Sequence, residues 1–334
     1  MATPGTSVAF IGTTPPSSQP QTFYVSIDNG TRVNTSFSDP NPHSYRQWYQ
    51  TPTLSDGLHT ITLSSLVNSS IDFALVTVGA QTPIKDERIV VDDNASGLNF
   101  SAGWRKDRDK FNIGGSTPIS GFTLSNSTHD TETVGSSFSY KFSGKNAFSR
   151  FQSYLTPNAG TAVAIYGLFD FSSPGLLALS FSIDSQSLSQ TYRVTSSSPQ
   201  LVAELGQQPN YLFYSYDFLT TGEHTLVVNV TECLNQTFRF DYLTYVPAFA
   251  KISDMPKDSG GSSGASSSPG TGNNGHRAVK SIVGGVVGAL VGSVLLGALL
   301  FLFLRRRARR RNETFNAWGK SICMYQYQHL RSLS

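Results

Sequence analysis

The chain has 334 residues, a formal net charge of +3 and only two cysteines, Cys233 and Cys323. Residues 1–280 hold 17 Lys and Arg against 21 Asp and Glu, a net charge of −4, whereas residues 305–334 hold eight against one, a net charge of +7. The basic pI therefore gives no argument for a nucleic-acid-binding protein. A single cysteine in the long first region excludes a disulfide framework there.

Residues 1–250 show the pattern of half-buried β-strands. Apolar and polar residues alternate over five to eight positions, and clusters of Gly, Pro, Asn, Asp and Ser separate these blocks. No sustained helical period occurs in this region. The pattern predicts an all-β fold, an antiparallel jelly-roll-like sandwich.

The same region compares well with itself. Four blocks recur in the same order: 7–12 with 162–167, 23–28 with 179–184, 47–63 with 212–228, and 73–78 with 241–246. We interpret residues 86–248 as one complete sandwich repeat and residues 1–80 as a second copy that lacks its opening strands. Because no signal peptide is visible either, we expect the chain to be the truncated form of a longer protein. The alternative is that a later membrane helix acts as a signal anchor.

A stalk and a membrane span follow the repeats. Residues 251–279 are rich in Ser and Gly and predict a disordered stalk. Residues 282–304 form an uncharged run of 23 residues, long enough for a transmembrane helix. Six arginines lie in residues 305–311, so we expect a type I protein of the plasma membrane, with residues 1–281 outside and a basic cytoplasmic tail over 305–334.

Two further patterns concern the membrane and the secretory route. Gly284, Gly288 and Gly292 repeat at a spacing of four, which indicates either helix-mediated self-association or the ordinary glycine content of spanning helices. Eight Asn-x-Ser/Thr acceptors on the outer side predict a glycoprotein. They are Asn29, Asn34, Asn68, Asn94, Asn99, Asn126, Asn229 and Asn235.

The outer region resembles a family in several blocks of the second repeat. These are Asp92 and Asp93 before a strand that ends in Trp104, and residues 129–133, 135–140, 163–167, 182–184, 222–226 and 240–245. The chain resembles the single-pass membrane proteins of mushroom-forming (basidiomycete) fungi, whose ectodomains look like galactose-binding jelly rolls. The resemblance implies a fungal cell-surface protein with a galactose-binding-like fold.

Three residues are candidates for ligand binding. Asp92 and Asp93 could help to hold a structural calcium ion, as the resemblance implies, or could form a turn at a strand end. Trp104 could stack on a sugar ring or fill the sandwich core. His59 and His224 occupy equal positions in the two repeats, which indicates a shared structural role in a turn rather than catalysis or metal binding.

The sequence contains no established catalytic motif. The Gly-x-Ser-x-Gly pattern at 260–264 lies in the stalk, without the strand and helix that a nucleophile elbow needs. We therefore predict a protein that is not an enzyme, has no metal ligands outside the calcium alternative, and binds a glycan or another cell-wall component. The alternative is a structural or adhesive spacer, or a wall sensor, with no small-ligand site.

Overall fold

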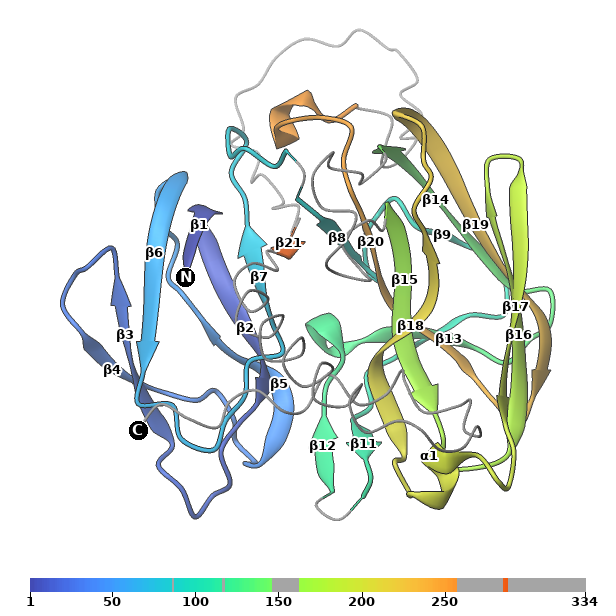
Figure 1. Cartoon of the computed structure of the whole chain (residues 1–334), viewed down its shortest axis with the longest axis horizontal. Coiled ribbons are helices and arrows are strands. Elements are labelled where there is room, and N and C mark those ends of the chain that lie inside the picture. The colour runs from blue at the N-terminus through green and yellow to red at the C-terminus, as the bar shows by residue number, and fades with distance from the viewer. Residues whose placement is uncertain (86, 116–117, 146–161, 257–284, 288–334) are drawn as a thin grey trace, which may run out of the picture. The chain divides into compact units, whose positions relative to one another are not determined.

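The computed structural model describes residues 1–85, 87–115, 118–145, 162–256 and 285–287 (Figure 1). They all lie in one unit of the chain. Regular structure in the described ranges is almost all β-strand, and the helical turns there are short: α1 (Pro199–Val202), η1 (Leu124–Asn126) and η2 (Ile252–Asp254). The prediction of an all-β fold is confirmed.

The second repeat folds into two antiparallel sheets. One sheet has the order β17-β16-β19-β14-β9. In the other, β15 lies between β18 and β20, β13 and β8 pair with successive halves of β20, and β10 pairs with β13. The bounds are β8 (Ile89–Asp92), β9 (Asn99–Phe100), β10 (Arg105–Asp107), β13 (Thr128–Thr131), β14 (Ser137–Gly144), β15 (Val163–Asp170), β16 (Gly175–Ile183), β17 (Gln186–Val194), β18 (Gln207–Tyr216), β19 (Gly222–Leu234) and β20 (Phe238–Tyr245).

The core of this repeat lies between its two sheets. Alternate residues of β19, Leu226 and Val228, are fully buried, and they share one apolar cluster with Ile165, Phe213 and Phe240 of the opposite sheet. The period of two puts these side chains on one face of each strand. Each large apolar side chain buried in this way contributes about 1.5–3 kcal/mol. The second repeat is therefore a two-layer β-sandwich.

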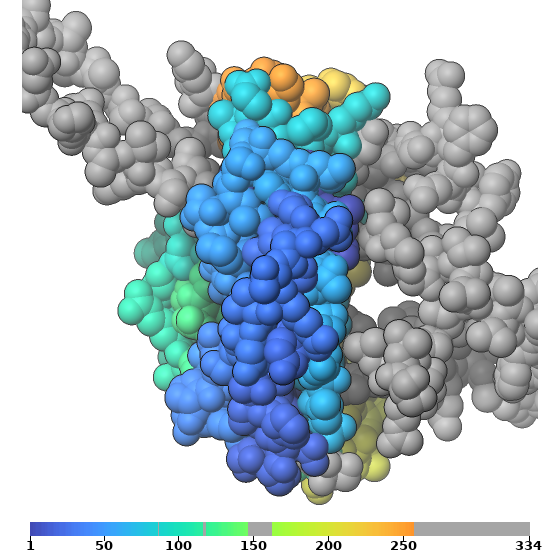
Figure 2. Space-filling model, turned by 90° about the vertical axis from the view of Figure 1, so that its left-hand side faces the viewer, coloured from blue at the N-terminus to red at the C-terminus, as the bar shows by residue number. Residues whose placement is uncertain are grey.

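The first repeat is a smaller sandwich. Its sheets have the orders β1-β6-β3-β4 and β7-β2-β5. The bounds are β1 (Ala2–Gly5), β2 (Ser7–Thr13), β3 (Thr22–Ile27), β4 (Val33–Ser36), β5 (Ser44–Gln50), β6 (Gly57–Ser64) and β7 (Phe73–Thr77). Trp48 is fully buried at its centre, in contact with the rings of Phe10, Phe23 and Phe37. Figure 2 faces this repeat, coloured in blue.

Strand pairing supports the internal repeat. β2 lies between β5 and β7, as β15 lies between β18 and β20, and β3 lies between β4 and β6, as β16 lies between β17 and β19. The register with β5 shifts between Phe10 and Ile11, and that with β18 shifts between Ile165 and Tyr166, which are equivalent positions. The two copies therefore share even an irregularity of their strands.

The next residue of each copy is a glycine for a steric reason. A Cβ atom on Gly12 would overlap the backbone oxygen of Ser70, and one on Gly167 would overlap the backbone oxygen of Arg239. A side chain would push β2 away from the loop before β7 in the first copy and β15 away from β20 in the second. The glycines allow the close backbone approach that follows each shift in register.

One element of the first repeat was not anticipated. We expected that repeat to have no counterpart of residues 87–161. However, β1 pairs with β6 over Ala2 to Gly5, and Gly5 lies opposite Gly57. The last four residues of β14 pair with β19 in the equivalent register, in which Gly144 lies opposite Gly222. β1 therefore takes the place of the end of β14.

The two sandwiches contact each other through sheet faces and one hairpin. The segment of the chain that connects β10 to β13 forms a hairpin of β11 (Phe111–Ile113) and β12 (Ile119–Gly121). β12 pairs in parallel with β5. Phe111 is fully buried against Tyr45 of β5. Asn210 donates a hydrogen bond of 2.7 Å to the Tyr45 hydroxyl and accepts one of 3.3 Å from the Tyr242 hydroxyl. This contact is therefore both apolar and hydrogen-bonded.

The predicted membrane helix and its surroundings fall almost wholly outside the described residues. Residues 285–287 are the exception: they form a short strand, β21 (Gly285–Val287), which pairs with β7 and β8. Glycine disfavours helix and β-branched valine suits an extended strand, so these three residues differ from the helix that we expected. Within the described ranges, no helix has the length and apolar character to cross a bilayer. The stalk beyond Pro256, the cytoplasmic tail, and the stripe of Gly284, Gly288 and Gly292 lie outside the described residues.

Candidate functional site: a polar pocket at one end of the second sandwich

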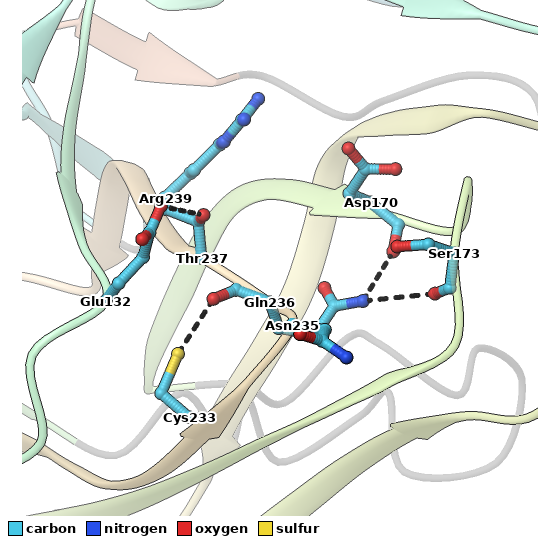
Figure 3. A pocket seen from close by; sticks show the side chains of 8 residues that line it. All are labelled: Glu132, Asp170, Ser173, Cys233, Asn235, Gln236, Thr237 and Arg239. Carbon is cyan, nitrogen blue, oxygen red and sulfur yellow. Dashed lines mark hydrogen bonds between the residues drawn. The ribbon is translucent and has the colours of Figure 1, made fainter.

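A pocket of about 360 Å³ opens on the second sandwich (Figure 3). Its lining consists of polar and charged side chains and one thiol. The lining residues are Glu132, Asp170, Ser173, Cys233, Asn235, Gln236, Thr237 and Arg239. We call this site the polar pocket.

Strand ends bring these residues together. β13 and β15 both end beside the start of β20, since Thr131 pairs with Phe238 and Leu168 pairs with Arg239. Glu132 directly follows β13, and Asp170 is the last residue of β15. Residues 235–237 form the turn from β19 to β20 and complete the rim.

Gln236 lies at the base of the turn and is 6% exposed. Its side-chain amide donates hydrogen bonds to the backbone oxygens of Asp170 (3.1 Å) and Ser173 (3.5 Å). Its Oε1 atom is buried and has no hydrogen-bond partner among the described residues. Since an unpaired buried acceptor costs about 1–3 kcal/mol, this oxygen favours a ligand that brings a donor.

Two more hydrogen bonds shape the wall. Thr237 Oγ1 donates to Glu132 Oε1 (2.8 Å), and Cys233 Sγ donates to the backbone oxygen of Gln236 (2.8 Å). Burial, and then the negative charge of Glu132, raise the pKa of the Cys233 thiol. The thiol is therefore protonated at neutral pH and is a weak nucleophile.

Arg239 supplies the positive charge of the polar pocket. Its Nε atom lies 3.5 Å from Asp130 Oδ2, and Asp130 is fully buried behind it. Glu132 and Asp170 place two carboxylates on the same lining. A carboxylate accepts hydrogen bonds and a guanidinium donates them, so the polar pocket can hold a ligand with several hydroxyl groups.

The predicted ligand residues Asp92 and Asp93 lie elsewhere, at the end of β8. Asp93 is 1% exposed and accepts hydrogen bonds from Ser127 Oγ (2.9 Å) and Asn94 Nδ2 (2.7 Å), and its other oxygen lies 2.8 Å from His129 Nδ1. Asp92 is half-buried; burial, and then the charge of Asp93, raise its pKa to about 6. The pair thus joins the strand end to β13, as the turn interpretation predicts.

Two buried carboxyls that the sequence did not single out extend this cluster. Asp241 sits at an irregularity of β20, and burial raises its pKa well above the ordinary value, with further contributions from Asp92, Asp93 and Asp130. Burial also raises the pKa of Asp130 to about 6. In the described part of the chain, no three His, Cys, Asp or Glu side chains are arranged to hold a metal ion. The calcium interpretation of Asp92 and Asp93, which also needs backbone carbonyl ligands, stays a prediction.

Trp104 packs instead of facing the polar pocket. Its indole contacts the rings of Phe100, Phe138 and Phe238, and its Nε1 atom donates a hydrogen bond of 3.0 Å to the backbone oxygen of Ser137. It is half-buried at the edge of the core. Of the two interpretations of Trp104, the structure favours core packing.

His59 and His224 hold equal places in the two sandwiches. Nδ1 of His59 lies 2.6 Å from Asp28 Oδ2, Nδ1 of His224 lies 2.8 Å from Asp184 Oδ2, and each Nε2 lies 2.8 Å from a backbone oxygen four residues earlier. The hydrogen bond that His59 donates to the Asp28 carboxylate is the main cause of a raised His59 pKa. These contacts tie a turn to a strand, which agrees with a structural role.

The predicted glycosylation sites are mostly at the surface. Asn29, Asn34, Asn68, Asn94, Asn99, Asn126 and Asn235 are exposed, and Asn229 is half-buried. The Asn94 amide already donates to Asp93 and Ser127. Asn235 differs from the other seven because it lines the polar pocket. Glycosylation itself stays a prediction.

Comparison with known proteins identifies no family. No protein-family model matches the chain, and no curated protein matches it. Among solved structures it is similar to the catalytic domain of a GH87 α-1,3-glucanase in complex with tetrasaccharides, with 12% identity, a TM-score of 0.26, and coverage of 48% of this chain and 28% of that one. It is also similar to a Paenibacillus xanthan lyase, with 13% identity, a TM-score of 0.25, and coverage of 73% and 22%. The match spans less than a third of each of these longer chains, and at such TM-scores neither carries an argument.

Proposed function

We propose that the chain is a type I cell-surface protein whose jelly-roll-like ectodomain binds a glycan or another cell-wall component in the polar pocket. The apolar run 282–304 and the arginines after it support an anchor in the membrane with residues 1–281 outside. The composition of the polar pocket supports the choice of ligand. The polar pocket rather than Asp92, Asp93 and Trp104 is the proposed site.

A sugar suits this lining because each hydroxyl can donate one hydrogen bond and accept others. Glu132, Asp170 and the unpaired Oε1 of Gln236 offer acceptors, and Arg239 offers donors. Such contacts orient a polar ligand without an aromatic platform. The observation that carries the proposal is a lining that brings two carboxylates, the unpaired Gln236 oxygen and a guanidinium to one pocket.

Hydrogen bonds within the protein orient both carboxylates of the polar pocket. Glu132 accepts a hydrogen bond from Thr237, and Asp170 accepts hydrogen bonds from the backbone of Ser172 (2.8 Å) and the side chain of Gln207 (3.2 Å). Both groups are therefore held by the protein itself. The remaining lone pairs of both carboxylates can accept hydrogen bonds from a ligand.

A glycan array tests the proposal with the full chain in mild detergent and two matched variants. Glu132→Gln removes a charge from the polar pocket, whereas Glu232→Gln removes one from an exposed position of β19 outside it. A hydrogen bond to a charged group contributes about 1.5–3 kcal/mol, so Glu132→Gln is expected to weaken binding at least about tenfold. Glu232→Gln should bind like the parent. Absence of binding to every glycan would reject the proposal.

A structural spacer or wall sensor is the second candidate, and the contact between the sandwiches favours it. β12 extends the sheet of the first repeat, and Asn210 joins Tyr45 to Tyr242 by hydrogen bonds. A pair of sandwiches held in this way suits a stiff element. Pulling single molecules by their ends distinguishes the candidates: a spacer with coupled repeats should unfold in one cooperative event, and two separate events would count against it.

A further inference from the structure

We propose that an N-linked glycan on Asn235 occupies the polar pocket and competes there with the external ligand of the proposed function, so that it regulates access to the site. The inference rests on the outward orientation of residues 1–281 proposed above. It concerns a modification and its effect, not the identity of a soluble ligand. The juxtaposition of an acceptor sequence and a pocket carries it.

The position of Asn235 suits attachment. Asn235, Gln236 and Thr237 form the Asn-x-Thr acceptor, and they are also the turn between β19 and β20. Asn235 is exposed and has a φ of 50°, a left-handed conformation that asparagine tolerates in turns. None of the other seven predicted acceptors lines the polar pocket.

The attachment step uses a lipid-linked oligosaccharide diphosphate as donor. A bond forms between Asn235 Nδ2 and the anomeric carbon of the first N-acetylglucosamine. The bond between that carbon and the diphosphate oxygen breaks, and the lipid diphosphate leaves with the proton from the amide.

The lining beside Asn235 is complementary to this sugar. The next residue, Gln236, offers its buried unpaired Oε1, and Glu132 and Asp170 offer carboxylate oxygens. The hydroxyl and acetamide N–H groups of the sugar are donors. Because the glycan is tethered at the rim, its effective concentration reaches roughly the millimolar range, and weak contacts suffice to fill the site.

Cys233 provides a direct readout, since its thiol lines the same pocket and is half-buried. The full chain is made in a eukaryotic secretory host with Cys323→Ser, which leaves Cys233 as its sole thiol. Mass spectrometry measures the occupancy of each acceptor. The rate of maleimide labelling of Cys233 at mildly alkaline pH then reports whether the polar pocket is open.

Asn235→Gln, and enzymatic removal of glycans from the folded parent, are both expected to raise the labelling rate about tenfold, as for a site that is closed about nine-tenths of the time. The control Asn34→Gln, which removes an exposed acceptor on β4 of the first sandwich, should leave the rate unchanged. Enzymatic removal covers the case in which Asn235→Gln disturbs the turn.

Three outcomes overturn the inference. If Asn235 is unmodified while other acceptors carry glycans, the inference fails and the outward orientation stands. If Asn235 is modified but the labelling rate does not change on deglycosylation, the glycan does not enter the polar pocket. If no acceptor is modified, the orientation and hence the proposed function fail together with it.

Discussion

Raising the pH from about 5 to about 7.5 is expected to destabilise the second sandwich, because its buried carboxyls must ionise. Burial raises the pKa of Asp92 and of Asp130 from 3.8 to about 6, and raises that of Asp241 well above its ordinary value. A group whose pKa is higher in the folded state stabilises the fold while it is protonated. Its contribution is lost as the pH rises through the folded pKa.

The size of the effect follows from the shift. About two pKa units correspond to about 3 kcal/mol for one isolated group over its whole titration, and roughly half of this falls above about pH 5 because the loss begins at the unfolded pKa of 3.8. Asp92 is half-buried and the carboxyls interact, so solvent and coupling reduce the sum. We expect a total loss of about 2–4 kcal/mol between these pH values. His59, whose pKa is also raised, acts in the same direction.

Urea unfolding of the full chain at both pH values, followed by circular dichroism, measures this loss. Asp241→Asn removes a carboxyl that is 1% exposed, so it should flatten the pH dependence. Asp109→Asn, at an exposed loop position, is the matched control and should not. The comparison stays above about pH 5 because Asp28 and Asp184 have lowered pKa values and lose their contributions as the pH falls further. Equal or greater stability at the higher pH would refute this reasoning.

Three other predictions concern the backbone, the turn histidine and the membrane. Gly167→Ala should lower the free energy of unfolding by at least about 2 kcal/mol, because its Cβ would overlap a backbone oxygen. Gly57→Ala meets open space and should lower it by less than about 1 kcal/mol. Thermal unfolding measures both, and similar losses would argue against the steric account. His224→Asn should cost about 1–3 kcal/mol in urea unfolding through lost hydrogen bonds, and no loss would exclude a structural role. The full chain should stay with membranes after carbonate extraction and a chain without residues 282–304 should not; release of the full chain would contradict the anchor.

The repeat could be predicted because strand patterns and turn glycines are local properties of the sequence. The matching blocks 7–12 and 162–167 correspond to β2 and β15, and the neighbours of these two strands are equivalent in the two repeats. The match of β1 to the end of β14 was missed because four residues carry too little pattern. It is visible only in the register with β6.

The polar pocket could not be predicted in the same way. Glu132, Asp170 and Gln236 are far apart in the sequence, and only the pairing of β13 and β15 with β20 brings them to one edge. Asp241 was missed because it lies in an apolar strand, where its burial depends on an irregularity in the pairing. Trp104 and Asp93 were noticed as residue types, but their neighbours decide whether such residues pack or bind.

The hairpin of β11 and β12 also has a consequence for solubility. A sheet that stops at β5 would present unpaired amide and carbonyl groups, which can recruit strands from another molecule. β12 pairs with Ser44 and Tyr45, and the amide of Phe122 donates a further hydrogen bond of 2.9 Å to the Tyr45 carbonyl. Loss of this hairpin would therefore leave the first repeat folded but with the edge of β5 exposed. Aggregation through that edge would then be observed before unfolding.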